Sequence, residues 1–239
     1  MNAATVGAFP QTSAAVTRPG LRRRRWLACC CAWACGSALC AGAGEALIAA
    51  AARGDLVATQ RELDAGADVN ARDAQGRNAV LAATQGGHVA VARALIRRGA
   101  DVNAQDSRRD SAFLLAGARG HAEIVRLALA AGADLRSTNR YGGTALIPAC
   151  HYGHVETVRV LLGSAIDVNH VNNLGWTALL EAVILGDGGQ RHTTIVELLI
   201  ARGADVNLAD RDGVTPLAHA RQRGQRAIAQ RLAAAGARG

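Results

Sequence analysis

The sequence contains no lysine, so arginine supplies all 27 of its basic residues. Aromatic residues are also scarce, at 3% of the chain, although half of all residues are hydrophobic. A core made from this composition consists mainly of alanine and leucine, whose small side chains let neighbouring backbones approach closely. At 239 residues the chain has room for one large domain or two small ones.

Acidic residues are missing from the first part of the chain, since none precedes Glu45. Arg18 and Arg22–Arg25 therefore contribute five of the eight net positive charges, which leaves +3 for residues 45–239. A domain so nearly balanced lacks the concentrated positive surface of a DNA-binding protein. We expect no nucleic-acid partner.

Cysteine is nearly absent beyond residue 40, where Cys150 stands alone. A single thiol cannot form an internal disulfide, so this part of the chain must be stable without one. The other cysteines lie in an N-terminal leader and are Cys29, Cys30, Cys31, Cys35 and Cys40.

Residues 1–43 contain the parts of an export signal in order. Arg22–Arg25 form the positive region, Trp26–Cys40 are uncharged and mostly apolar, and Ala41–Ala43 offer small residues for cleavage. We predict cleavage after Ala43, a first helix opening at Glu45, and a periplasmic or secreted protein.

Other interpretations of the leader remain open. Trp26–Gly44 is uncharged and close to the minimum length that spans a bilayer, so residues 1–43 could instead form an uncleaved anchor. A transit peptide also fits the arginine-rich start, whereas Leu39 before Cys40 fits a lipoprotein poorly. The segment RRRWL at Arg23–Leu27 resembles the twin-arginine export motif, so both export routes stay open.

A short phrase of the form GADVN occurs five times along the remaining chain. Its aspartate recurs every 33 residues, with a last interval of 38, and a histidine recurs at the same intervals. The five extra residues are Asp187–Arg191, DGGQR. A fixed period in this range indicates a solenoid, whose units stack because none can bury its apolar face alone.

Each period predicts a helix, a turn, a second helix and an irregular link. In the stretch 78–101, Gly86-Gly87 ends the first helix and His88 begins the second, whose apolar residues recur at helical spacing. Gly99 ends the second helix. The aspartate and asparagine of the link can bond their own backbone and hold an outward turn.

This pattern resembles the ankyrin repeat, through GHVETVRVLL at Gly153–Leu162, TPL at Thr215–Leu217 and the GADVN phrases. The resemblance implies an all-α fold, a solenoid of stacked helix-turn-helix units with outward β-turn or hairpin links. The repeat domain would span 44–239. Its parts are an N-cap at 45–72, repeats at 73–105, 106–138, 139–171 and 172–209, and a terminal repeat at 210–239.

The chain departs from the family at the start of each first helix, because Thr-Pro-Leu-His is intact nowhere. Leucine or isoleucine replaces the buried histidine, which exchanges a polar tie for packing. Pro148 must kink its helix unless it falls in the first turn.

The residues that could carry chemistry favour structural roles. The recurrent histidines would lie about 8–10 Å apart, too far to share one ion, so we expect them to hydrogen-bond at helix starts. His151 and His154 are closer but lack a third ligand. Cys150 takes the place of Thr84 and Gly117, which favours a buried, inert thiol. No catalytic or phosphate-binding motif appears, so we expect no enzyme, metal or cofactor.

The residues that differ between repeats predict a surface for a protein partner on the concave face of the stack, the face through which ankyrin-like proteins usually bind. Beyond the leader, Phe113 occupies a core slot, and the other three aromatic residues lie in the third and fourth repeats. The candidate partner-binding residues are Arg140, Tyr141, His151, Tyr152, Asn173, Trp176, Glu181, Asp187 and Arg191. We expect a monomeric, non-catalytic interaction module. The alternatives are a secreted effector acting on host proteins and an accessory factor for an envelope enzyme.

Overall fold

A computed structural model of the chain describes residues 32–239, with side chains from residue 42 onward. Within this range the chain forms twelve helices and no strand. They are α1 (Ala32–Arg53), α2 (Leu56–Asp64), α3 (Ala79–Gln85), α4 (Val89–Arg97), α5 (Ala112–Arg119), α6 (Ala122–Ala130), α7 (Leu146–His151), α8 (Val155–Leu162), α9 (Ala178–Ile184), α10 (Gln190–Ala201), α11 (Pro216–Gln222) and α12 (Arg226–Ala234).

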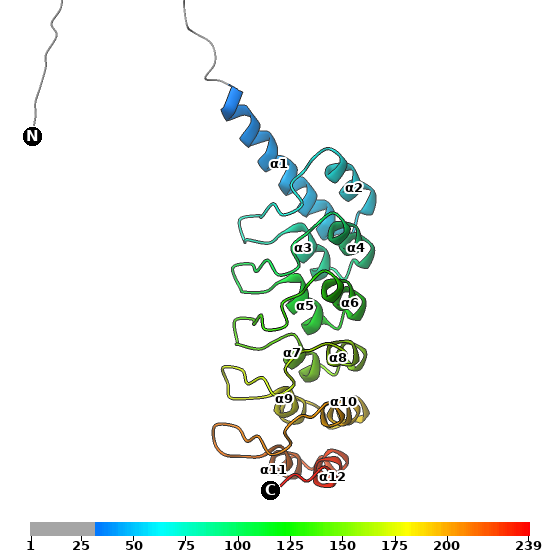
Figure 1. The fold of residues 1–239 in the computed structure, drawn as a ribbon, viewed down its shortest axis with the longest axis vertical. Helices are drawn as coiled ribbons and strands as arrows, with labels where there is room; N and C mark the ends of the chain where they lie inside the picture. The colour runs from blue at the N-terminus through cyan, green and yellow to red at the C-terminus, as the bar shows by residue number, and fades with distance from the viewer. Residues whose placement is uncertain (1–31) are drawn as a thin grey trace, which may run out of the picture.

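The helices stack in two columns, as the sequence period predicts (Figure 1). The first helices of the repeats, α3, α5, α7, α9 and α11, form one column, and their partners form the other. The links between repeats project sideways from the column of first helices. The prediction of an all-α solenoid is confirmed.

Helix α1 begins earlier than expected, at Ala32 rather than at Glu45, and runs without a break past Ala43. Leu47, Ile48 and Ala51 are buried, so the C-terminal part of α1 provides the first layer of the core. Among the residues from 32 onward, no helix combines the length and the apolarity needed to cross a bilayer. Arg22–Arg25 lie outside the described residues, and the export signal stays a prediction.

The first helices start at a side-chain cap. Asn78, Ser111, Thr177 and Thr215 each accept a hydrogen bond from the backbone N–H three residues later, at 3.0–3.2 Å. Helix α7 is the exception. Pro148 falls in its first turn, where a proline is tolerated. However, α7 starts one residue later than its sisters, at Leu146, and lacks a side-chain cap.

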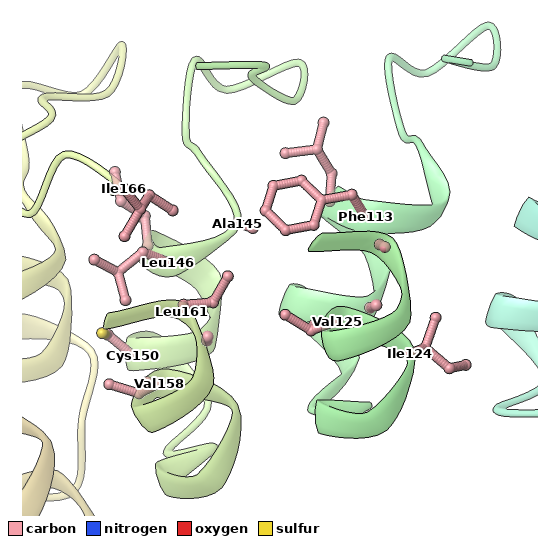
Figure 2. Packing of buried hydrophobic residues seen from close by; sticks show 14 of the residues in the cluster. Phe113, Ile124, Val125, Ala145, Leu146, Cys150, Val158, Leu161 and Ile166 are labelled. Atoms are coloured by element: carbon pink, nitrogen blue, oxygen red, sulfur yellow. The ribbon is translucent and has the colours of Figure 1, made fainter. Parts of the chain in front are cut away.

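The core follows slots shared by all repeats. Val80, Phe113, Leu146 and Leu179 occupy one slot, and each is at most 1% exposed. Figure 2 shows the Phe113 ring pointing toward the start of α7. Thus Phe113 is a core residue, as predicted.

Small residues set the spacing between first helices. A Cβ atom at Gly117 of α5 would lie 2.6 Å from the carbonyl oxygen of Ala145, so no larger side chain fits there. Cys150 occupies the same slot as Gly117 in the next repeat and is fully buried (Figure 2). The close approach inferred from the alanine-rich composition is therefore present.

An asparagine ties consecutive links together. The Nδ2 of Asn103 donates to the carbonyl of Gly132 (3.1 Å), while its Oδ1 accepts from the backbone N–H of Asp134 (2.8 Å). The same pair of bonds is formed by Asn70, Asn169 and Asn207. Arg136 stands at this position in the third copy of the phrase, and no such tie is formed there among the described residues.

The recurrent histidines do not bond as expected, at the start of their own helices. His88 occupies the N-cap position of α4 but makes no side-chain cap bond. Instead its Nε2 lies 3.2 Å from the carbonyl oxygen of Ala52 in the preceding unit, and His192 Nε2 lies 2.9 Å from that of His151. The histidines join neighbouring units, because the free carbonyls at the end of the preceding first helix face them.

Candidate partner-binding groove

A groove of about 860 Å³ crosses the second, third and fourth repeats, on the face formed by the links and the first helices. Its lining comes from the turns of the links and from the C-terminal ends of α5, α7 and the residue after α9.

The same repeat slots line the groove in three adjacent units. One row runs along the link turns and consists of Arg108, Tyr141 and Leu174. A second row runs along the ends of the first helices and consists of Arg119, Tyr152 and Leu185. A third row, deeper in the groove, consists of Leu115, Pro148 and Glu181.

Two tyrosines stand out from the middle of the groove. Tyr141 and Tyr152 are 55% and 56% exposed. The guanidinium carbon of Arg140 lies 4.6 Å from the centroid of the Tyr141 ring, which holds this ring by a cation–π contact. The Tyr152 ring stacks on His151 with centroids 4.2 Å apart. Both tyrosines are thus held in place yet open to a partner.

Arginines dominate the second-repeat end of the groove. The Asp110 carboxylate lies 3.5 Å from Arg108 and 3.6 Å from Arg140 and is shared between the two guanidinium groups. Arg119 is exposed and forms no ion pair with any described residue. Burial, and then the nearby charge of Asp106, raise the pKa of Asp110. This end therefore carries excess positive charge.

A buried carboxyl group lies at the fourth-repeat end. Glu181 is 6% exposed, and its Oε1 accepts a hydrogen bond of 3.0 Å from Asn172 Nδ2. Its Oε2 lies 3.6 Å from Nδ1 of His151, too far for a hydrogen bond. Burial raises the pKa of Glu181 to about 7. Burial also lowers the pKa of His151, and the nearby charge of His192 lowers it further.

The structure brings five of the nine predicted partner-binding residues into this groove. They are Arg140, Tyr141, His151, Tyr152 and Glu181. Asn173 is exposed and Trp176 half-buried in the link turn of the fourth repeat, and neither lines the groove. The surface assignment itself stays a prediction.

Asp187 lies in the turn between α9 and α10, and Arg191 lies in the first turn of α10; neither lines the groove. The Asp187 carboxylate lies 2.7 Å from His192 Nδ1 and accepts the backbone N–H of Gly189 at 2.9 Å. These two contacts, the backbone bond first, lower the pKa of Asp187. Asp187 thus organises the inserted residues of this turn.

Sequence reasoning missed Arg108, Arg119, Leu174 and Leu185. The signal for them was present in the period, because they occupy the slots of Tyr141 and Tyr152 one repeat earlier or later. Their residue types do not mark them, because arginine and leucine are common in this chain, whereas aromatic residues make up only 3% of it.

The residues considered for chemistry do not form a reactive centre. Cys150 is fully buried, and burial raises the pKa of its thiol well above the ordinary value, which keeps it protonated and inert. In the part of the chain from residue 32 onward, no group of three or more His, Cys, Asp or Glu side chains is placed to hold a metal ion.

Stacked helical pairs with a polar and aromatic groove along their first helices define a repeat-protein binding scaffold. The family model for ankyrin repeats in three copies matches residues 26–106, 112–210 and 167–238. The chain belongs to the ankyrin repeat family.

Solved ankyrin structures are similar over most of the chain. An ankyrin repeat domain (ABAYE2397) from Acinetobacter baumannii AYE is 54% identical, with a TM-score of 0.78 over 80% of this chain and 98% of that one. The ankyrin repeat protein EF0377 is 40% identical, with a TM-score of 0.76 over 80% and 97%. The ankyrin repeat domain of Bcl-3, of the IkappaB protein family, is 27% identical, with a TM-score of 0.71 over 81% and 86%.

A curated relative matches a shorter stretch. The ankyrin repeat protein YahD of Escherichia coli (strain K12) is 53% identical over 57 residues. This match covers 24% of the chain and 28% of YahD. Ankyrin repeats are in general protein–protein interaction modules without catalytic activity.

Proposed function

We propose that this chain is a non-catalytic module that is exported to the periplasm or cell envelope and binds a partner protein in the groove of the second to fourth repeats. The observation that carries the proposal is the pair of exposed tyrosines, Tyr141 and Tyr152, each held by a neighbouring side chain inside the groove. Rigid, exposed aromatic residues are the usual anchors of protein interfaces, and truncating one commonly costs about 2 kcal/mol of binding free energy.

The test is capture of a partner from an envelope extract, followed by mass spectrometry. Tyr141→Ala combined with Tyr152→Ala should abolish capture and leave thermal stability unchanged, because both rings are more than half exposed. The matched control is Val57→Ala, which truncates a 78% exposed side chain on α2, outside the groove. Undiminished capture by the double variant would place the interface elsewhere.

The variant Trp176→Ala distinguishes two candidate interfaces, the link turn of the fourth repeat and the groove. If this single change abolishes capture while the tyrosine variant does not, the partner contacts the outer turn of the fourth repeat instead. The half-buried position of Trp176 means that its stability must be measured alongside.

Export is tested independently by cell fractionation. We expect the chain in the periplasmic or envelope fraction, because residues 1–43 have the charge and hydropathy order of an export signal. Recovery from the culture medium would favour the secreted effector, and retention in the cytoplasm would refute export altogether.

A further inference from the structure

The groove has opposite electrostatic character at its two ends. At the second-repeat end, the guanidinium groups of Arg108 and Arg140 lie 3.5 and 3.6 Å from the Asp110 carboxylate, and Arg108 also lies 3.8 Å from Asp106. Arg119 adds a third guanidinium group that pairs with no described carboxylate, so positive charge is in excess at this end. At the fourth-repeat end the only carboxyl group in the lining is that of Glu181, and no described arginine forms an ion pair with it. The charge of the groove therefore changes along the axis of the stack, from positive at the second repeat to negative or neutral at the fourth.

Glu181 is placed as an acceptor for a group that the chain itself does not supply. In the three preceding repeats its slot holds apolar residues, Ala82, Leu115 and Pro148, which need no partner. Asn172 satisfies Oε1, but Oε2 accepts no hydrogen bond from any described residue. Oε2 is not fully buried, so a donor from a partner can reach it, and such a donor would offset the unfavourable burial of the rest of the carboxylate.

The groups that face Glu181 favour a cationic donor. Helix α7 contributes His151 and the buried thiol of Cys150, and the link contributes Asn172. On the other side, His219 at the corresponding position of α11 is already paired with Asp210, at 2.7 Å. No fixed cation neutralises Glu181 among these neighbours, so a lysine or arginine of a partner would find an uncompensated acceptor.

We infer that the groove binds an extended segment of its partner that places a lysine or arginine on Glu181 Oε2 and an acidic side chain among Arg108, Arg119 and Arg140. First helices of neighbouring repeats lie about 8–10 Å apart, so the second-repeat and fourth-repeat ends, two intervals apart, are separated by roughly 16–20 Å. An extended chain covers about 3.3 Å per residue. The basic and acidic residues of the segment are therefore about five to six positions apart. This inference rests on the proposed function and specifies its ligand.

Binding should strengthen as the pH rises through neutrality. Burial raises the pKa of Glu181 to about 7, so the carboxylate that a cation requires is lost as the pH falls below that value. Protonation of His151 at low pH would act in the same direction by competing for the same oxygen.

The experiment selects random phage-displayed 12-residue peptides on the full chain at pH 8 and measures the enriched peptides by fluorescence anisotropy. We expect each enriched peptide to contain a basic residue, and a change of that residue to glutamine to weaken binding at least tenfold. Glu181→Gln should weaken the unchanged peptide by a similar factor, with no further loss when the two changes are combined. Lowering the pH from 8 to 6 should weaken the wild-type chain and leave the Glu181→Gln variant unaffected.

The matched control is Glu156→Gln on α8, an exposed carboxylate outside the groove that pairs with Arg126, and it should bind as the wild type does. Circular dichroism checks that each variant is folded. Enriched peptides that lack basic residues, or that bind Glu181→Gln undiminished, would overturn the inference. If those peptides still require Tyr141 and Tyr152, the proposed groove stands. If no peptide is enriched, or if binding ignores both tyrosines, the proposed groove fails as well.

Discussion

Replacing Arg109 by glycine should stabilise the protein, although the change deletes a large side chain. Arg109 is the only non-glycine residue with positive φ among those described, at 63°. Gly76, Gly142, Gly175 and Gly213 occupy its slot in the other repeats, with φ between 73° and 85°. The link turn therefore requires a left-handed residue, and one repeat supplies a side chain that opposes this conformation.

The size of the effect follows from two opposing contributions. The left-handed conformation costs a non-glycine residue about 1–2 kcal/mol, whereas glycine adds about 0.5–1 kcal/mol of chain entropy to the unfolded state. The Arg109 side chain is exposed and forms no ion pair with the described residues. We therefore expect a net gain of about 0.5–1 kcal/mol in the free energy of unfolding.

The assay is urea and thermal unfolding of the full chain, where about 1 kcal/mol shifts the Tm of a domain of this size by about 2–4 °C. Arg109→Ala is the control, because it removes the same side-chain atoms but keeps the Cβ that opposes positive φ. Equal stabilities of the glycine and alanine variants, or a loss of stability in the glycine variant, would refute the argument from backbone strain.

Three further predictions concern stability and reactivity. Asn103→Ala should lower the free energy of unfolding by about 1–2 kcal/mol, because it removes two bonds between links. Arg136→Ala, at the same slot, should change it little, and equal losses in the two variants would contradict the role of this tie. The pKa of Glu181 is raised on folding, so this group weakens the fold progressively as the pH rises from about 4.5 to 7. Glu181→Gln should thus stabilise the protein at pH 8, on the order of 2 kcal/mol, and give no gain at pH 4; an equal gain at both would be inconsistent with ionisation. Cys150 should resist alkylation until denaturant is added, as peptide mapping can show, because its thiol is buried and protonated; rapid labelling of the folded chain would disprove this.

The two-column stack could be predicted because every repeat carries the same local signals for two helices and a turn. Helix-spaced apolar residues, the glycines after each helix and the capping residues Asn78, Ser111, Thr177 and Thr215 are local signals, and the period multiplies them. The helix start predicted at Glu45 applies to a chain cleaved after Ala43, whereas in the uncleaved chain α1 already includes Ala32. The alanine-rich stretch continues as helix through Gly42 and Gly44, because single glycines lower helix propensity by only about 1 kcal/mol each and alanine favours the helix.

Only part of the groove lining could be predicted from the sequence, because the lining depends on which positions of different repeats lie on the same face of the stack. The exposed tyrosines drew attention to the third repeat, while Arg108 and Arg119, one period earlier, were not recognised as their neighbours. The contacts of the recurrent histidines could not be predicted from local sequence either. Their position before the second helix suggested capping, whereas the contacts reach carbonyls of the preceding unit.

By itself, the sequence determined the repeating unit, its length and its core, since these depend on residues within one period and on the burial of a periodic apolar face. Only the tertiary structure decided that Glu181 is buried with one oxygen unpaired, that Asn103 ties two links, and that three rows of side chains form one groove. Those properties arise between repeats, from residues about 33 positions apart. Their distances and shared exposure are set by stacking and not by local conformational preference.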